Sequence, residues 1–198
     1  MLTLACEKGY SLAELMFVLV VLAVVAAVTA PPAQGRSARR LDSAAVEVVA
    51  ALEFARGEAM RTGVPHGVRV RNGTRISVFR LDRSATPPAE RYDVRHPVDK
   101  SLYDIDLSTG TFTQGTAVTG YFLFQRAGAA EQAATFDSHG EPVRGNDARP
   151  LATGGVLLTN EGYSLAVAVT PLTGRTTEGA VGAVVGNPAD AFAAPVQP

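Results

Sequence analysis

Glu14 has a side chain that needs a partner, because it lies within an otherwise apolar stretch. From Leu15 to Ala30 every residue is apolar except Thr29. With Leu12 and Ala13, this run approaches the roughly 20 residues that span a bilayer as a helix. A carboxylate in the middle of a membrane helix costs about 2.5–3.5 kcal/mol on insertion scales. We therefore expect a cationic group to lie beside Glu14.

A cut after Gly9 would provide that cation. Tyr10 would become the amino terminus, one helical turn from Glu14 and at the positive end of the helix dipole. The carboxylate would then pair with its own amine or with that of a neighbouring subunit. In a filament of packed apolar helices, a pair between Glu14 and an adjacent Tyr10 would fix the stagger between subunits.

Two other interpretations of the N-terminal segment stay open. A secretory signal peptide ends at small residues, and Val28-Thr29-Ala30 fits that pattern, although Pro31 would directly follow the cut. That interpretation predicts a secreted binding domain. A plain membrane anchor keeps the segment in place but gives Glu14 no partner.

The stretch Gly9-Tyr10-Ser11-Leu12-Ala13-Glu14-Leu15-Met16, with the valine-rich run and Pro31, resembles the prepilin signal of type IV pilin-like proteins. The resemblance implies a leader of residues 1–9 and a membrane-spanning or filament-core helix of residues 10–35. It also implies that a prepilin peptidase cleaves after Gly9 and methylates the amine of Tyr10, and that Glu14 and Pro31 serve assembly. The family usually has phenylalanine at the place of Tyr10 and a more basic leader.

A second helical pattern follows the apolar run. Arg36, Arg39 and Arg40 come first, as expected where a helix leaves the hydrocarbon, and Gly63 and Pro65 favour a stop. We expect an amphipathic helix over residues 36–62, so that residues 10–61 form one helix of roughly 75–80 Å that is interrupted near Pro31-Pro32. Apolar residues recur at steps of three and four and define its packing face: Leu41, Ala45, Val48, Leu52, Ala55 and Ala59.

Beyond Pro65 the pattern becomes the alternation of a β-sheet. Residues 68–71 and 76–78 alternate apolar and polar side chains around Asn72-Gly73, which predicts a hairpin. A second tight turn is expected at Glu161-Gly162, surface loops at 83–91 and 138–155, and a mobile tail over 178–198. The fold class is therefore α+β, a helix with an antiparallel sheet. Further strands are expected at 101–107, 118–125, 134–137, 155–159 and 163–170.

Three later stretches resemble the GspH/FimT group of minor pseudopilins and minor pilins. They are residues 50–59, the run Phe136-Asp137-Ser138-His139-Gly140, and Pro171-Leu172-Thr173-Gly174-Arg175. The resemblance implies a pilin-like fold, with a globular domain over residues 36–177. It also implies a structural subunit of a type II secretion pseudopilus or a type IV pilus, and no enzyme.

Some FimT-like members bind DNA through a C-terminal Gly-Arg-x-Arg element, so DNA uptake is the alternative function. The matching place here is Gly174-Arg175-Thr176-Thr177, in which the second arginine is missing. Arg69, Arg71 and Arg75 have matching parity on the first hairpin and would share one face. That basic strip, with Arg175, is the predicted DNA-binding surface.

Other chemistry finds little support in the sequence. The net charge is −1, which gives no overall attraction to nucleic acid. His66, His96 and His139 are far apart and are expected on the surface or in loops, and the lone Cys6 would leave with the leader, so neither a metal site nor a cofactor is expected. Asp137, Ser138 and His139 are consecutive turn residues and cannot form a catalytic triad.

The resemblance also implies the protein's partners and location. The partners would be the prepilin peptidase, other pilins or pseudopilins of the same filament, an inner-membrane assembly platform and membrane lipid. The chain would cross the inner membrane once, with its globular domain on the periplasmic side.

Overall fold

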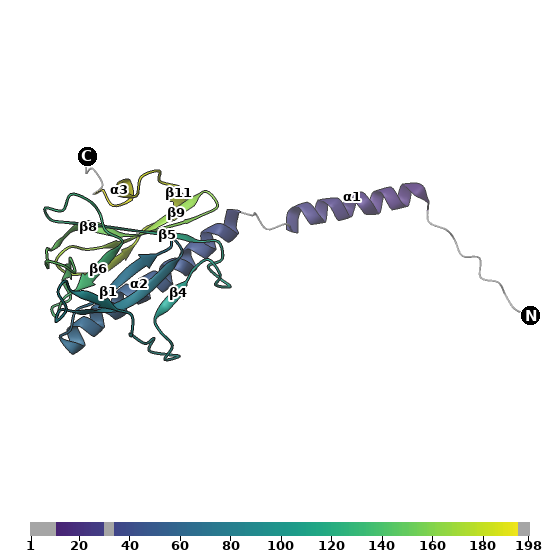
Figure 1. Ribbon diagram of the computed structural model, residues 1–198. Coiled ribbons are helices and arrows are strands. Elements are labelled where there is room, and N and C mark those ends of the chain that lie inside the picture. The colour runs from purple at the N-terminus through teal and green to yellow at the C-terminus, as the bar shows by residue number, and fades with distance from the viewer. Residues whose placement is uncertain (1–10, 30–33, 194–198) are drawn as a thin grey trace, which may run out of the picture. The chain divides into compact units, whose positions relative to one another are not determined.

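The computed structural model describes residues 11–29 and 34–193. Gly9, Tyr10 and Pro31, which the sequence assigns to processing and assembly, lie outside the described residues. The chain divides into two units, Met1–Gly35 and Arg36–Pro198, and Figure 1 shows both.

The first unit contains one helix, α1 (Leu12–Thr29). The carbonyl oxygen of Ser11 accepts hydrogen bonds from the amides of Glu14 and Leu15, at 3.0 and 3.1 Å, and so begins the helix. Its apolar side chains are exposed, as Leu12 (76%) and Phe17 (71%) show. Among the helices of residues 11–29 and 34–193, none is both long enough and apolar enough to cross a membrane.

The second unit is built around α2 (Gln34–Thr62). The helix ends at the predicted place, and Gly63 follows it with a φ of 69°, a left-handed conformation that suits glycine after a helix. All six apolar residues of the predicted packing face are fully buried. The 36–62 helix prediction is therefore confirmed, with a start two residues earlier.

Within the described residues, the strands form two antiparallel sheets. The first has the order β3-β2-β1-β6-β7, with β4 also paired to β2, and the second has the order β10-β9-β8-β5, with β11 also paired to β9. In the first sheet the strands are β1 (His66–Arg71), β2 (Arg75–Asp82), β3 (Ala89–Arg91), β4 (Asp104–Asp106), β6 (Ala133–Phe136) and β7 (Pro142–Val143). In the second they are β5 (Ala117–Phe124), β8 (Leu151–Asn160), β9 (Tyr163–Val169), β10 (Thr176–Glu178) and β11 (Gly182–Ala183).

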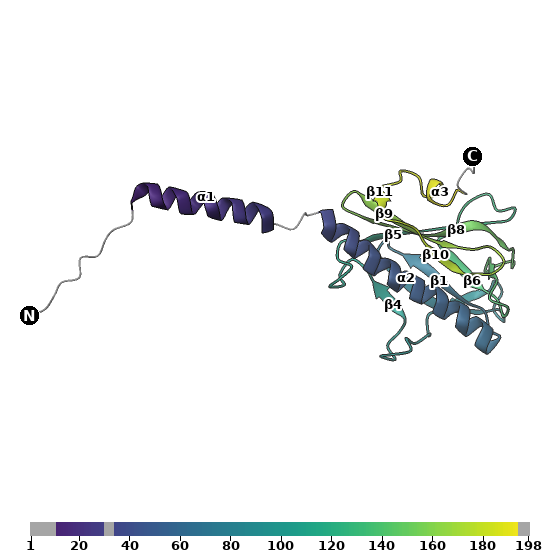
Figure 2. The ribbon, with the colours of Figure 1, turned by 180° about the vertical axis from the view of Figure 1, so that it is seen from behind.

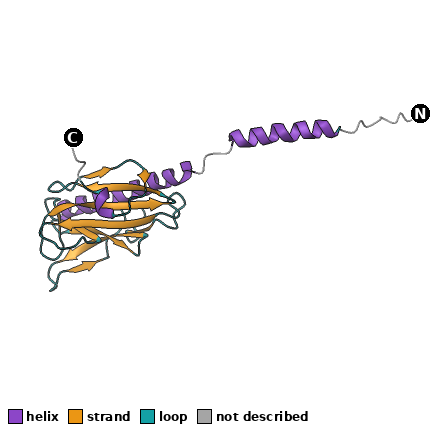
Figure 3. Ribbon diagram, turned by 90° about the horizontal axis from the view of Figure 1, so that it is seen from above, coloured by secondary structure: helices purple, strands orange, loops and turns teal. Residues whose placement is uncertain are grey.

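The main core lies between α2 and both sheets. Figure 2 views the domain from the helix side, with β5, β8 and β9 above α2 and β4 below it. Figure 3 shows the strands layered beside the helix. Alternate residues of each strand point into this core. The fully or almost fully buried strand residues that pack with α2 include Val68, Ile76 and Val78 from the first sheet, and Val156, Leu158 and Val167 from the second.

Both predicted hairpin turns are present. Glu161 and Gly162 have φ values of 44° and 87° and join β8 to β9 as a two-residue turn, since Asn160 pairs with Tyr163. The first turn has three residues instead of two, because Arg71 pairs with Arg75. Both conformations require positive φ, which Asn and Gly adopt most readily.

The C-terminal segment differs from the predicted mobile tail. Residues 178–193 include β11, which pairs with β9 at the edge of the second sheet, and a short helix, α3 (Pro188–Ala191), which contacts β5 and β8. The ring of Phe192 stacks on Tyr121 with centroids 5.9 Å apart, and its carbonyl oxygen accepts a hydrogen bond of 3.0 Å from the Thr153 hydroxyl. Gly155 leaves the space that this ring fills. The packing of Phe192 therefore holds residues 178–193 against the second sheet, although their sequence has no periodicity.

Short edge strands were missed within the expected loops. β3 lies in the predicted loop 83–91, β7 lies in the loop 138–155, and β8 begins within that loop at Leu151. The strand expected at 101–107 is reduced to β4. These two- and three-residue strands are defined by pairing with β2 and β6, and a pattern so short has no periodicity of its own.

Candidate functional site

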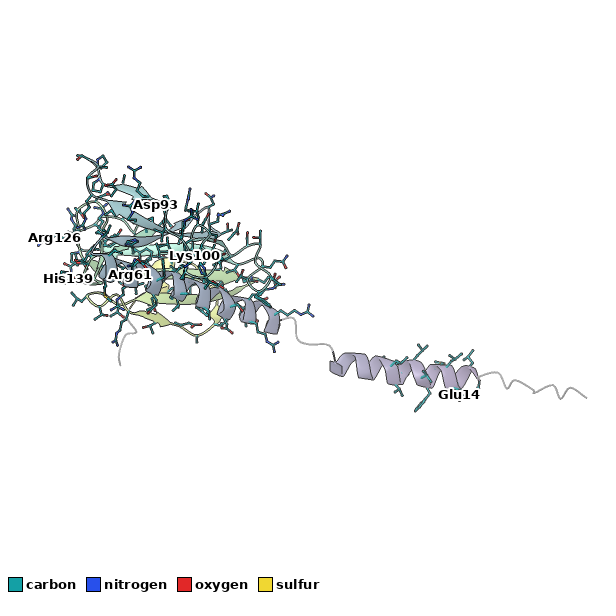
Figure 4. The ribbon with its side chains drawn as sticks, turned by 90° about the horizontal axis from the view of Figure 1, so that it is seen from below. Glu14, Arg61, Asp93, Lys100, Arg126 and His139 are labelled. Atoms are coloured by element: carbon teal, nitrogen blue, oxygen red, sulfur yellow. The ribbon has the colours of Figure 1, made fainter. Side chains whose placement is uncertain are left out.

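Glu14 is exposed in the first turn of α1, where Figure 4 labels it. It is the sole acidic residue between Leu12 and Thr29. Apolar side chains surround it on the helix, and Leu15 and Met16 are 56% and 59% exposed. The helix thus presents an apolar surface carrying one carboxylate, and within a single chain this surface contacts little.

The arginine strip of the first hairpin exists, but carboxylates neutralise most of it. Arg71 pairs directly with Arg75 across the hairpin and Arg69 is two residues along, so the three share one face, as predicted. Arg69 forms a two-pronged ion pair with Glu90, at 2.5 and 2.7 Å. Arg75 contacts Asp104 at 2.8 Å and Asp106 at 3.4 Å.

Arg71 is not paired with a carboxylate within the described residues, and its guanidinium lies 4.9 Å from the ring centroid of Tyr92. The Tyr92 hydroxyl donates to Glu90. Burial opposes ionisation of Glu90, but the hydrogen bonds from Arg69 and Tyr92 outweigh it and hold the pKa of Glu90 below its usual value. Burial, followed by that bond, raises the pKa of Tyr92 to about 12. Arg69, Glu90 and Tyr92 therefore form a closed structural network.

Arg175 lies elsewhere, in the exposed turn between β9 and β10 of the second sheet. The turn is closed by a hydrogen bond of 2.9 Å from the Gly174 amide to the Thr170 carbonyl. The structure therefore assigns Arg175 and the hairpin arginines to different sheets and does not combine them into one strip.

The three stretches that resemble GspH/FimT proteins meet at the C-terminal end of α2. Gly174 packs against the carbonyl of Gly140, the ring of Phe136 and the side chain of Arg56. A Cβ at Gly140 would lie 2.8 Å from the Met60 sulfur and 3.0 Å from Arg56 Nε. Both glycines have positive φ, 79° for Gly140 and 64° for Gly174. Glycine suits the positive φ at both positions, and at Gly174 the backbone carbonyl of Gly140 also leaves no space for a Cβ.

The Asp137 turn has a structural role, and the histidines lie apart from one another. The Asp137 carboxylate accepts hydrogen bonds of 2.9 Å from the amides of His139 and Glu141, which confirms the predicted turn. His139 is exposed beside it, at the end of the domain where Figure 4 also labels Arg61. His66 differs from the expected surface position: it is 5% exposed, and its Nδ1 lies 2.8 Å from the Val64 carbonyl. Across the described ranges, no three side chains are arranged to hold a metal ion.

Two contacts went unnoticed in the sequence. The Ser37 hydroxyl donates to Glu161 at 2.5 Å and ties the first turn of α2 to the β8–β9 hairpin. Thr176 donates to Glu53 at 2.8 Å and ties β10 to the same helix. Each joins residues more than 120 positions apart, and no local pattern indicates such a pair.

The fold and the N-terminal helix together define a pilin-type subunit: an apolar helix with one early carboxylate, followed by an amphipathic helix packed on antiparallel sheets. The chain belongs to the GspH family, because the model of the type II transport protein GspH matches residues 44–174. The prokaryotic N-terminal methylation motif matches residues 4–30. Pseudopilins and pilins are structural subunits and not enzymes, and their partners are other subunits of the same filament.

Similar solved structures include the minor pseudopilin EpsH from the type II secretion system of Vibrio cholerae. It is 15% identical with a TM-score of 0.45, over 75% of this chain and 99% of that chain. The type IV minor pilin FimU of Pseudomonas aeruginosa is 16% identical with a TM-score of 0.42, over 70% of this chain and 87% of that chain. No curated protein was found to match the chain.

Proposed function

We propose that this chain is a minor pseudopilin of a type II secretion pseudopilus, cleaved after Gly9, methylated at Tyr10 and assembled through α1. One observation carries the proposal: a methylation motif over residues 4–30 and a GspH domain over residues 44–174 occur in the same chain. The motif contains both Gly9 and Tyr10, and also Glu14. The cut would be made by a prepilin peptidase in the inner membrane.

Glu14 is the residue that links processing to assembly. Its carboxylate is the single charge on an apolar helix surface, and burial of such a surface in a filament would leave the charge without solvent. The amine of Tyr10 on an adjacent subunit would neutralise it, since an ion pair offsets the cost of desolvation. Pro31, which lacks an amide hydrogen, would separate this assembly helix from α2.

The same proposal implies a location for each part of the chain in the cell. Residues 10–35 would hold the subunit in the inner membrane, in contact with lipid and the assembly platform, before it enters the filament. The domain of residues 36–177 and its C-terminal segment would lie on the periplasmic side. The methylation motif supports this anchorage.

DNA binding is the alternative function, and the ion pairs count against its proposed surface. Binding to phosphate would compete with the contacts of Arg69 to Glu90 and of Arg75 to Asp104 and Asp106. Arg71 and Arg175 are then the cations on which a DNA site would depend. A filter-binding titration against salt tests it, because each phosphate contact adds to the slope of affinity on salt concentration.

The experiment that tests the main proposal compares Glu14→Ala and Glu14→Gln with Glu178→Ala, which removes an exposed acid on β10. Each full chain is expressed with its secretion system, and the filament fraction and the intact mass are measured. We expect at least a tenfold loss from the filament for both Glu14 variants and none for Glu178→Ala. All three should still begin at methylated Tyr10.

Normal incorporation of the Glu14 variants would exclude the docking role of the carboxylate. A chain that starts at Pro31, or that still carries Met1, would overturn the processing proposal itself.

A further inference from the structure

A cavity of about 410 Å³ opens at the C-terminal end of α2, where the helix meets β1, β2 and the segment that follows β3. Cavities of about 300–1,000 Å³ are typical of ligand-binding sites. Figure 4 labels two of the lining residues, Arg61 of the helix and Asp93 of the segment after β3. The lining shares no residue with the arginine strip or with the contacts of Gly174, so none of the sites described above uses this cavity.

Part of the cavity wall is apolar. Phe54, Val64 and Val94 form it. Phe54 and Val94 also pack against the main core, and the ring centroid of Phe54 lies 5.0 Å from that of Tyr103. The Val94 carbonyl accepts a hydrogen bond of 2.9 Å from the Tyr103 amide, which holds the segment after β3 in place. The wall therefore offers a fixed apolar contact to an occupant.

A buried imidazole forms another part of the wall. His66, the first residue of β1, is 5% exposed and lines the cavity. Its Nδ1 lies 2.8 Å from the Val64 carbonyl, which can only accept a hydrogen bond, so Nδ1 carries the proton. Within the described residues Nε2 forms no hydrogen bond, and it is not one of the side-chain atoms sealed in the interior without a partner. Nε2 of the neutral ring is therefore an accessible acceptor.

Two ion pairs occupy most of the charged lining. Arg61 contacts Glu58 and Arg80 contacts Asp93, both at 2.7 Å. The hydrogen bond from Arg61 is the main reason why the pKa of Glu58 lies below its usual value, and the bond from Arg80 has the same effect on the pKa of Asp93. Both carboxylates therefore stay ionised and paired near neutral pH.

Arg95 is the cation of the lining that these pairs leave over. It forms no ion pair in residues 11–29 and 34–193, and its Nη1 donates to the Lys100 carbonyl at 2.8 Å. That bond occupies one of the five N–H groups of the guanidinium. The backbone of Arg95 is held by its pairing with Leu102. Arg95 therefore keeps donors for a carboxylate, whose geometry a guanidinium matches.

We propose that this cavity binds an acidic segment of a partner protein. A carboxylate of the segment pairs with Arg95, a neighbouring backbone N–H donates to Nε2 of His66, and an apolar side chain contacts Phe54 and Val94. A peptide supplies all three groups within a few residues. A nucleic acid supplies closely spaced phosphates without the apolar side chain, and the carboxylates of Glu58 and Asp93 would repel those charges.

Every group in this contact belongs to the second unit, so the contact stands independently of the assembly through α1 proposed above. A loss of peptide binding would leave that assembly untouched, and a loss of filament incorporation would leave the peptide contact untouched.

Titration of the full chain in detergent micelles with blocked peptides tests the proposal, with binding followed by NMR. The probe has a central Leu-Glu-Leu within serine and glycine, and the matched peptides have Leu-Gln-Leu or Ser-Glu-Ser instead. The glutamine peptide should bind about tenfold more weakly, because it loses the charge-assisted hydrogen bond. The Ser-Glu-Ser peptide should bind about threefold more weakly, because it loses apolar contact. Equal binding of all three, or no binding of the probe at millimolar concentration, would overturn the proposal.

A variant of the lining separates binding from folding. Arg95→Gln should weaken binding of the probe about tenfold and remove its advantage over the glutamine peptide, with an unchanged unfolding temperature, since Arg95 is exposed. Arg126→Gln is the matched control, because Arg126 is also exposed, is labelled in Figure 4 and does not line the cavity. If Arg95→Gln keeps the preference for glutamate, the ion pair is wrong and the proposal fails.

The ring nitrogens of His66 report the second contact without a change of sequence. When the probe saturates the chain, the nitrogen resonance of Nε2 should move upfield, because Nε2 accepts a hydrogen bond, while that of Nδ1 should stay in place. An unmoved Nε2 resonance would contradict the proposed contact.

Two further ligands distinguish other occupants. Butyrate is a free carboxylate with an apolar chain, and it should bind far more weakly than the probe. Butyrate that binds as tightly would assign the cavity to small acids, and duplex DNA that displaces the probe would assign it to nucleic acid. Either result would overturn the proposal of a protein segment.

Discussion

The two helices α1 and α2 differ in whether their apolar side chains are buried within the chain. α2 buries Leu41, Val48 and Leu52 against two sheets of its own chain. α1 leaves Leu12, Leu15 and Phe17 exposed and carries one charge. The packing of α2 stabilises the fold, whereas the exposed apolar side chains of α1 are available for the assembly proposed above. Sequence changes should therefore act on stability in α2 and on assembly in α1.

The largest expected effect on stability comes from the buried face of α2. Leu52→Ala should lower the free energy of unfolding by about 2–5 kcal/mol, because it leaves a cavity in a fully packed core. Leu15→Ala, its counterpart on α1, should change it by less than about 0.5 kcal/mol. Denaturant unfolding of the full chain measures both, and equal losses would contradict the division of roles.

Gly174→Ala should cost about 2–5 kcal/mol. The new Cβ meets a positive φ, which costs about 1–2 kcal/mol, and a collision with the Gly140 carbonyl and Arg56, which costs about 1–3 kcal/mol. Gly162→Ala is the matched control, since Gly162 also has a positive φ but nothing within 4 Å of its Cβ position. If thermal unfolding shows the same loss for both, the close packing of Gly174 contributes nothing.

Phe192→Ala should cost about 1–3 kcal/mol, because the ring is 8% exposed and stacked on Tyr121. Phe112→Ala removes an equally large ring that is exposed, and it should leave the unfolding temperature unchanged. Limited proteolysis provides a second measurement: cleavage within residues 178–193 should appear only in the Phe192 variant. Rapid cleavage there in the unaltered chain would instead support the prediction of a mobile tail.

The smallest effect concerns Glu90 and depends on pH. Its pKa is lowered in the folded chain, so its ion pair stabilises the fold above the unfolded-state pKa of about 4.3. That contribution is lost as the pH falls through the lower folded value. Glu90→Gln should therefore cost about 1 kcal/mol at pH 7 and progressively less below pH 4.

Unfolding followed from pH 7 to pH 2 checks this, with Glu178→Gln as the control. A loss that is constant over the whole range would mean that the charge of Glu90 is not involved.

Long and strongly periodic segments could be predicted from the sequence. The buried face of α2 and the strands β1, β5 and β9 follow from spacing alone, and the hairpin turns follow from Asn72-Gly73 and Glu161-Gly162. The edge strands and the packing of Phe192 could not be predicted, since they depend on partners distant in the sequence. For the same reason the parity of the arginines was right, while the carboxylates opposite them, Glu90 and Asp104, could not be foreseen.

The edge of β9 that faces away from β8 is paired along most of its length with β10 and β11. A chain that stopped at residue 177 would remove β11 and the last residue of β10, and would leave unpaired amides and carbonyls along residues 163–167 of β9. Such an edge recruits strands from other molecules. We therefore expect residues 178–193 to reduce aggregation by covering this edge, and versions of the protein without α1 should retain the chain through Phe192.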